Sequence, residues 1–375
     1  MKRNLSRRDF LKFAGMGLGA MALRPFNLET LYLPKPLPQF PNSEIIGRIL
    51  GMTDIMSRSS NDPLQASSVG VLYDDNLVEW GREVVGNAVG RTNQRFLETS
   101  QGYIWAPLVQ PTRNLPNVSI TAMPAGASGF WAEVTVPYID LALEGPVVSS
   151  WLQSLISYNF PPRLYYGQVV WIDQVRADTN GVVYYRWNES PGHGYGPGDI
   201  FWADGAGLKI LTDEDVAPIS PEVEPNVKTI RVDLTYQTLG CFEGLNEVYF
   251  CRISSGAEFN TGGEPVDNWK TPTGDLNTHW KIFSLNMSGG GSAAGYSTPA
   301  VPWVTMISGE GIAIHGAFWH NDFGERRSHG CINLKPEDAK WVFRWTTPHI
   351  SLAQSEQRMT WPDHGTVASV TQLEV

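Results

Sequence analysis

The chain has 375 residues, enough for two or three domains. Hydrophobic residues make up 42% and charged residues 18% of it, which excludes disorder over most of the length. The formal net charge of −10 disfavours nucleic acid as a partner, because a phosphate backbone is itself negative. The 37 glycines and 26 prolines separate short segments of alternating apolar residues, a pattern that predicts a mostly β protein.

Residues 1–26 have the features of an export signal. Ser6 to Lys12, which includes the pair Arg7-Arg8, resembles the twin-arginine motif, and an apolar run from Phe13 to Leu23 follows it. This run is too short to span a bilayer, so cleavage is favoured over a permanent anchor. A short amphipathic helix of the fold is the alternative interpretation. The resemblance implies export by the twin-arginine machinery to the cell envelope, the periplasm or the cell wall.

Two β units are expected upstream of residue 212. The prolines in residues 27–44 predict an extended linker, and residues 45–113 and 118–211 hold the strand candidates. The candidates are residues 69–73, 77–85, 103–109, 130–136, 164–175, 181–187 and 199–202, with 148–158 either a strand or a short helix. Each unit has a glycine turn followed by an aromatic-rich strand, which resembles the end of bacterial SH3-like barrels. The resemblance implies two small SH3-like β-barrel modules, whose aromatics either bind wall glycan or fill the barrel cores.

Residues 212–227 are expected to form a second linker, residues 228–348 a further domain, and residues 349–375 a tail. The segment from Lys228 predicts a strand and a hairpin, with Cys241 and Cys251 on its two sides. The predicted register places Cys251 opposite Thr238, so a disulfide would need a shifted register and two buried thiols are favoured. Cys331 then remains as a free thiol, which in an exported protein is a candidate for chemistry. Residues 288–295, rich in glycine, are expected to form a loop or a flap over a cleft.

A histidine and a cysteine lie in adjacent glycine-bounded segments near the C-terminal end. His315 follows the apolar residues 311–314, and Cys331 comes 16 residues later in Ser-His-Gly-Cys-Ile-Asn. A thiol is a useful nucleophile only after it loses its proton, and a nearby imidazole can accept that proton. Gly330 would let backbone amides approach a substrate carbonyl. Pro336 predicts the first residue of a helix that continues to Trp345.

This arrangement resembles the active-site signature of L,D-transpeptidases of the YkuD type. Support comes from the Ile-x-Val-Asp-Leu-x-x-Gln segment that starts at Ile230, from Ser255-Gly256, and from Thr271-Pro272-Thr273-Gly274. The resemblance implies a β-sandwich catalytic domain with a helix beside the active-site strand. It also implies residue roles: nucleophile Cys331, general acid and base His315, its orienting carbonyl on Gly316, oxyanion contacts from the amides of Gly330 and Cys331 with His329 nearby, and a loop braced by Ser328 and Asn333.

The resemblance further implies acyl transfer on peptidoglycan stem peptides, with release of the terminal D-alanine and attack of a second stem's amine on the thioester. Water as the acceptor would give carboxypeptidase activity instead. No cofactor and no metal are expected. The segment between the two motifs supplies further candidates for substrate contacts: Trp319, His320, Arg326 and Arg327, the arginines for stem carboxylates. Asn333 stands where many family members have arginine.

Three other interpretations remain. His315, His320, His329 and Cys331 are all zinc-ligand types, although no H-E-x-x-H motif is present. A cysteine peptidase of the NlpC type often carries SH3-like modules, but there the cysteine precedes the histidine in the chain. A non-catalytic wall-binding protein would leave the His and Cys pair without a role.

Overall fold

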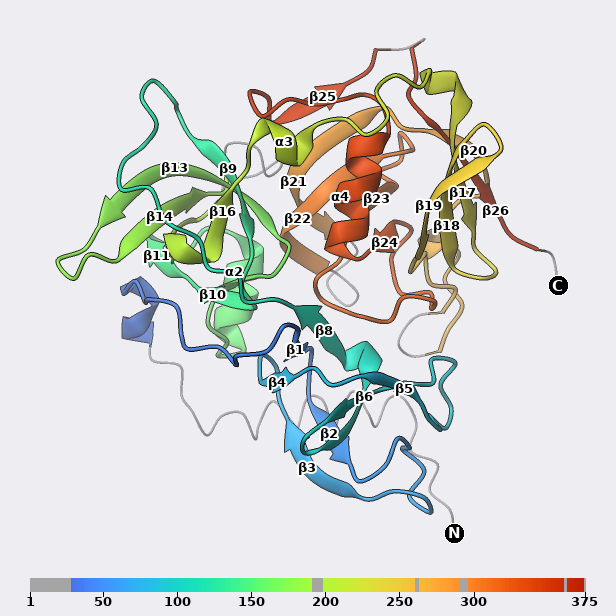
Figure 1. Ribbon diagram of the computed structural model, residues 1–375, viewed down its shortest axis with the longest axis horizontal. Coiled ribbons are helices and arrows are strands. Elements are labelled where there is room, and N and C mark those ends of the chain that lie inside the picture. Colours follow the sequence, from blue (N-terminus) through green and yellow to red (C-terminus); the bar gives the residue numbers. More distant parts are fainter. Residues whose placement is uncertain (1–27, 191–197, 260–262, 290–295, 361–362, 374–375) are drawn as a thin grey trace.

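The structure is a computed structural model, and it describes residues 28–190, 198–259, 263–289, 296–360 and 363–373. The expected export signal and residues 290–295 of the expected loop or flap lie outside these ranges. Three β-rich units follow one another along the chain, coloured blue to teal, green, and yellow to red in Figure 1. No helix in the described ranges is both long enough and apolar enough to cross a membrane.

The first unit consists of two small sheets around a core that includes Ile49, Leu97 and Ile104. Its elements are β1 (Ile46–Ile49), β2 (Thr53–Met56), β3 (Ser68–Leu72), β4 (Leu77–Glu79), β5 (Glu83–Val85), β6 (Arg95–Thr99), β7 (Gly102–Trp105), η2 (Ala106–Leu108) and β8 (Val109–Thr112). The sheet orders are β4-β1-β8 and β3-β2-β7-β6-β5. The strand expected over residues 77–85 is divided between the two sheets. The chain crosses at Gly81, where a Cβ would lie 2.4 Å from the carbonyl oxygen of Glu98.

The second unit is a six-stranded sheet in the order β11-β15-β14-β13-β9-β16, with a separate β10-β12 pair. Its elements are β9 (Phe130–Val134), β10 (Tyr138–Asp140), β11 (Ala142–Glu144), α2 (Ser150–Ser157), β12 (Arg163–Tyr165), β13 (Val169–Ala177), β14 (Val183–Asn188), β15 (Ile200–Asp204), η3 (Gly205–Gly207) and β16 (Leu208–Ile210). Residues 148–158 thus contain a helix, because Ser149 caps α2 by accepting from Leu152 N and Trp151 is buried. Upstream, η1 (Leu28–Tyr32) packs Leu31 into this unit's core.

The third unit contains two five-stranded sheets in the orders β19-β18-β17-β26-β20 and β24-β23-β22-β21-β25. Its elements are α3 (Asp213–Val216), η4 (Pro225–Val227), β17 (Lys228–Asp233), β18 (Thr238–Glu243), β19 (Asn246–Arg252), η5 (Asp267–Trp269), β20 (Gly274–Asn277), β21 (Trp280–Gly289), β22 (Tyr296–Met306), β23 (Ala313–Gly316), β24 (Ile332–Leu334), α4 (Pro336–Trp345), β25 (Glu356–Arg358) and β26 (Val367–Thr371). Apolar residues of both sheets and of α4 share one core. Figure 1 shows α4 between the two sheets in this view. This architecture confirms the predicted mostly β class, a sandwich preceded by β units.

Two details of the third unit bear on the sequence predictions. Residues 349–375, expected as a tail, hold β25 and β26, and β26 lies between β17 and β20 inside its sheet. In the predicted hairpin, Cys251 lies opposite Leu239 and Cys241 lies opposite Tyr249. All three cysteines are free, and Cys241 and Cys251 are buried, so the prediction of two buried thiols is confirmed.

Helix α4 holds the strands that carry the His and Cys motif. It begins at Pro336, as the sequence predicts, and it buries Val342, Phe343 and Trp345. Its last carbonyls are capped by two buried lysines. Lys281 donates to the carbonyls of Phe343 and Thr346, and Lys228 Nζ lies 3.1 Å from Trp345 O. Lysine N–H groups at a helix C-terminus satisfy its orphan carbonyls by hydrogen bonding, so the helix is fixed beside β22 and β23.

The second unit shares the core of the third. Trp131 of β9 is buried in the third unit's core, with its ring 5.3 Å from that of Phe283 on β21. At the edge of this contact Lys340 of α4 forms a 2.6 Å ion pair with Glu133 of β9. The two units are therefore packed against each other through buried apolar side chains rather than joined only by a linker.

Candidate active site

His315 lies on β23, inside the third unit. A Cβ on the next residue, Gly316, would lie 2.9 Å from Pro302 Cγ and 3.1 Å from Pro336 Cα, so glycine lets β23 fit between β22 and α4. His315 Nδ1 lies 3.2 Å from the Gly316 carbonyl oxygen. Burial lowers the pKa of His315 to about 4 despite this hydrogen bond. The ring is thus neutral near pH 7, Nδ1–H donates to the carbonyl, and Nε2 keeps a lone pair that can accept a proton.

Cys331 precedes β24, which pairs in parallel with β23. The register places Ile332 beside Ile314 and Asn333 beside His315. Because side chains alternate across a strand, Cys331 and His315 lie on the same face of the sheet, as diagonal neighbours. Trp319 packs against the same apolar cluster as Cys331, and its ring lies 5.8 Å from that of His315.

The Cys331 thiol is protonated near pH 7 in this structure. Burial raises the pKa of Cys331 to about 11, although a backbone hydrogen bond from Ala313 opposes the shift. Sγ lies 3.7 Å from the carbonyl oxygen of Gly311. The imidazole of His315 and the thiol of Cys331 are therefore both neutral near pH 7, a neutral pair rather than a thiolate with an imidazolium. In general, a neutral thiol that meets a neutral imidazole can pass its proton to the ring as the sulfur attacks.

The turn before Cys331 is fixed by hydroxyl groups. Ser328 Oγ donates to Cys331 O at 2.5 Å and accepts from Gly330 N at 3.1 Å. Thr271 Oγ1 donates to Gly330 O at 2.7 Å. Gly330 has φ +122°, and a Cβ there would lie 2.7 Å from Ile312 Cδ1. The N–H of Gly330, expected to face an oxyanion, is thus used inside the turn, and this glycine acts through its conformation.

His329 lies between two aromatic rings. Its ring is 4.1 Å from that of Trp269 and 4.7 Å from that of Tyr296, the first residue of β22. Trp269 and Tyr296 come from distant segments, and no sequence pattern indicates that they meet His329. Thr271 belongs to the Thr-Pro-Thr-Gly turn, which supports the family resemblance but indicates no role for its hydroxyl.

His320 and Asn333 form a buried polar pair beside His315, and not an exposed contact surface. Asn333 Nδ2 lies 3.1 Å from His320 Nε2, and Asp322 N donates to His320 Nδ1. Burial, with Arg327 and His315 nearby, lowers the pKa of His320 to about 3, so this ring is also neutral. The pair belongs to the interior support of the site.

The two arginines expected to meet substrate carboxylates have protein partners. Arg326 forms a 3.3 Å ion pair with Glu258 and donates to Leu234 O at 3.0 Å. Arg327 forms a 2.7 Å ion pair with Asp322. Both therefore hold the loop between β23 and β24.

The first unit also holds this loop, a feature that the sequence analysis missed. The contacts are Arg48 Nη2 to Phe318 O (2.7 Å), Asn321 N to Pro107 O (3.2 Å), Asn321 Nδ2 to Ala106 O (3.3 Å), Arg95 Nη2 to Asn321 O (3.0 Å) and Asn93 Nδ2 to Asp322 Oδ1 (3.1 Å). Arg48 is buried, and it also forms a 2.8 Å ion pair with Asp75. We call this set of contacts the loop clamp; it connects the N-terminal unit to the loop that separates His315 from Cys331.

The ligand types considered for zinc do not gather into a metal site in the described residues. Across those ranges, no group of three or more His, Cys, Asp or Glu is placed to hold a metal ion. The arrangement provides a thiol on Cys331, a neutral imidazole on His315, and a glycine turn at Gly330 that hydroxyl groups hold in place.

Comparisons with known proteins identify the third unit. Residues 227–367 match the model of the YkuD family, described as an L,D-transpeptidase catalytic domain. No curated protein sequence matches the chain.

Solved structures similar to this chain include several L,D-transpeptidases. The Enterococcus faecium L,D-transpeptidase C442S mutant is 23% identical over 40% of this chain and 51% of its own, with a TM-score of 0.29. An L,D-transpeptidase fragment from Xylanimonas cellulosilytica is 18% identical over 40% of this chain and 62% of its own, with a TM-score of 0.26. The Mycobacterium smegmatis L,D-transpeptidase is 17% identical over 68% and 100%, with a TM-score of 0.30.

The present chain thus spans about half the length of the Enterococcus faecium protein. The family match covers β17 to the start of β26, which includes His315, Cys331 and the helix beside them. The chain therefore contains an L,D-transpeptidase catalytic domain of the YkuD family at residues 227–367.

Proposed function

We propose that the protein is an exported peptidoglycan L,D-transpeptidase in which Cys331 is the nucleophile and His315 the general acid and base. The observation that carries this proposal is the parallel pairing of β23 with β24, which puts the two side chains on one face of the sheet within a matched catalytic domain. The substrates are stem peptides of the wall, and the site of action is the cell envelope.

The reaction begins from the neutral pair. Cys331 Sγ attacks the carbonyl carbon of the third residue of a tetrapeptide stem, while His315 Nε2 takes the thiol proton. The Gly316 carbonyl keeps Nδ1–H in place and stabilises the imidazolium that forms. The tetrahedral oxyanion collapses to a thioester as His315 returns the proton to the leaving amine of D-alanine.

The second half of the reaction uses the same groups. The amine of a second stem attacks the thioester, His315 takes its proton, and the Cys331 sulfur leaves and is reprotonated. The product is an amide bond between the third-residue carbonyl of the first stem and the acceptor amine. That amine belongs to the third residue of the second stem or to another position. With water as the acceptor, the same cycle removes D-alanine without a cross-link.

The proposal assigns supporting roles to the rest of the loop. Ser328 and Thr271 hold the turn at Gly330, and His329 lies over it between its two aromatic neighbours. Asn333 and His320 support His315 from the interior. Residues 1–26 deliver the protein through the twin-arginine machinery, which a precursor-processing assay in cells with and without that machinery would test.

The activity is tested by incubation of the chain from residue 27 onward with disaccharide-tetrapeptide. Mass spectrometry should detect loss of D-alanine and formation of a dimer. The Cys331→Ala variant should give neither product, whereas Cys241→Ala, which removes a buried thiol remote from the loop, should give both. Product formation by Cys331→Ala would refute the assignment of the nucleophile.

A further inference from the structure

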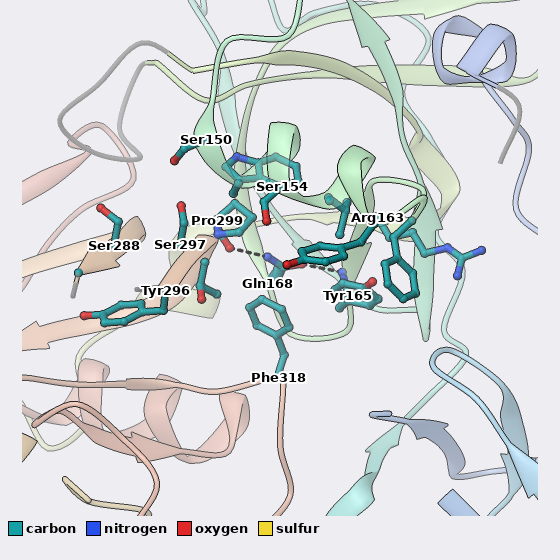
Figure 2. A pocket seen from close by; sticks show the side chains of 16 residues that line it. Ser150, Ser154, Arg163, Tyr165, Gln168, Ser288, Tyr296, Ser297, Pro299 and Phe318 are labelled. Carbon is teal, nitrogen blue, oxygen red and sulfur yellow. Dashed lines mark hydrogen bonds between the residues drawn. The ribbon is translucent and has the colours of Figure 1, made fainter. Parts of the chain in front are cut away.

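A cleft of about 810 Å³ lies between the second unit and the catalytic domain. One wall is α2 with Ser150 and Ser154, together with Tyr158, the residue that follows the helix. The other wall is formed by β21 and β22 with Ser288, Tyr296 and Ser297. Figure 2 shows side chains from both walls around the cleft, with Phe318 below them in this view. Gln168 fixes the floor, since its Nε2 donates to Pro299 O at 2.9 Å. A cleft of this volume is in the range that holds a small organic ligand.

The lining combines aromatic rings with neutral hydroxyl groups. Six aromatic side chains and five hydroxyl side chains line it: Trp151, Tyr158, Phe160, Tyr165, Tyr296 and Phe318, with Ser150, Ser154, Ser288, Ser297 and Thr298. Tyr158 is 60% exposed, so its ring is available as a platform. Aromatic faces together with hydroxyl groups suit a ligand that has both apolar C–H faces and many hydroxyl or amide groups.

The charges in the lining favour an uncharged ligand. Arg163 is the one charged side chain among the residues that line the cleft. It is neutralised by two carboxylates, with 2.7 Å ion pairs to Asp75 and to Asp140. A stem peptide, which carries free carboxylates, would find no available cation here, whereas a neutral N-acetylated sugar would leave no charge unpaired.

The cleft reaches the active site at two points. The ring of Tyr296 lies against that of His329, two residues before Cys331, with 4.7 Å between the ring centroids. Phe318 contacts Trp319 at 5.1 Å between ring centroids, and Trp319 contacts His315. A polymer lying in the cleft would thus have its side branches within reach of Cys331.

We propose that this cleft binds a segment of the neutral, N-acetylated glycan strand from which the reacting stem peptide branches. The part of this proposal that links the bound glycan to a reaction at Cys331 rests on the proposed function. The binding of glycan in the cleft does not. The cleft would hold the polymer while the stem enters the catalytic site, and so favour stems attached to glycan over free peptides.

Binding is tested on the Cys331→Ala chain with chitotetraose, a neutral N-acetylglucosamine tetramer, by isothermal titration calorimetry. We expect saturable binding that Tyr158→Ala weakens about tenfold. Tyr236→Ala is the matched control, because Tyr236 is 67% exposed in the turn between β17 and β18, outside the cleft. The Tyr236→Ala variant should bind chitotetraose as tightly as the parent does. Absence of saturable binding up to about 10 mM, equal losses in both tyrosine variants, or displacement by free tetrapeptide would overturn the proposal.

A kinetic measurement separates this proposal from the proposed function. For the Cys331 enzyme, kcat/KM should be higher for disaccharide-tetrapeptide than for free tetrapeptide, and Tyr158→Ala should lower that ratio. Equal kcat/KM for both substrates would contradict the glycan site. If neither substrate reacts, the proposed function fails, and the calorimetric result alone decides whether glycan binds.

Discussion

Replacement of Arg48 by methionine should disconnect the first unit from the catalytic loop. The Arg48 guanidinium donates to Phe318 O at 2.7 Å and to Gln110 Oε1 at 2.9 Å, and it pairs with Asp75 at 2.8 Å. It also lies 4.0 Å above the ring of Tyr165 in the second unit. One buried side chain thus connects the two β units to a carbonyl only three residues beyond His315.

The expected loss of stability follows from these contacts. Removal of one partner of a buried ion pair costs about 3–5 kcal/mol, and an unsatisfied buried carbonyl costs about 1–3 kcal/mol more. Asp75 keeps its 2.7 Å pair with Arg163. Burial raises the pKa of Asp75, but the two guanidinium groups outweigh it and hold that pKa below its usual value. Because one guanidinium remains, the lower end applies, and we expect Arg48→Met to cost about 4 kcal/mol in total.

Urea unfolding followed by tryptophan fluorescence measures this change, and turnover of disaccharide-tetrapeptide below the unfolding transition measures its effect on the loop. Turnover should fall in Arg48→Met and less in Arg48→Lys, which keeps the charge beside Asp75. Arg82→Met is the control: Arg82 pairs with Glu98 on the surface, with 76% of its side chain exposed, and its loss should change neither quantity. If Arg48→Met had an unfolding free energy within about 1 kcal/mol of the parent value and unchanged turnover, the role assigned to the loop clamp would be refuted.

Three further predictions concern the active-site turn and the proton acceptor. In the proposed mechanism the neutral form of His315 is the base, and burial lowers its pKa to about 4. We therefore expect kcat/KM to be lost as the pH falls through about 4, and an acid limb near pH 6.5 would contradict the neutral pair. Gly330→Ala should lower kcat about tenfold to hundredfold, because an alanine at φ +122° carries about 1–3 kcal/mol of backbone strain. Gly309→Ala should leave kcat unchanged, because a Cβ added there meets no other atom. Thr271→Val should cost about 1–3 kcal/mol of unfolding free energy and Thr271→Ser much less; equal losses would exclude the hydroxyl as the cause.

Local sequence signals predicted the elements around the active site well. Pro336 and the spacing of Val342 and Trp345 predicted α4, and the hairpin residues predicted a register close to the observed one. These features depend on neighbours within a few residues, which the sequence displays directly. The pairing of His315 and Cys331 was inferred from a family signature, since spacing alone does not reveal that β23 and β24 are parallel.

Long-range contacts were beyond such signals. Arg48 and Phe318 are 270 residues apart, and nothing in either segment's pattern indicates that they meet. The strand expected at residues 77–85 is split because Gly81 lies against the Glu98 carbonyl, a contact between two sheets. β26 was missed because its alternating segment is short and its partners, β17 and β20, lie far upstream. Likewise, Arg326 and Arg327 read as free cations until Glu258 and Asp322 were located beside them.

The most direct test of the account is to trap the acyl-enzyme. The mature chain is mixed with disaccharide-tetrapeptide, quenched in acid within the first turnover, and digested for mass spectrometry. The account predicts a disaccharide-tripeptide joined as a thioester to the peptide that contains Cys331, with one D-alanine released per adduct, and no adduct on Cys241 or Cys251. D-alanine release without any adduct at Cys331, or release by the Cys331→Ala variant, would contradict it.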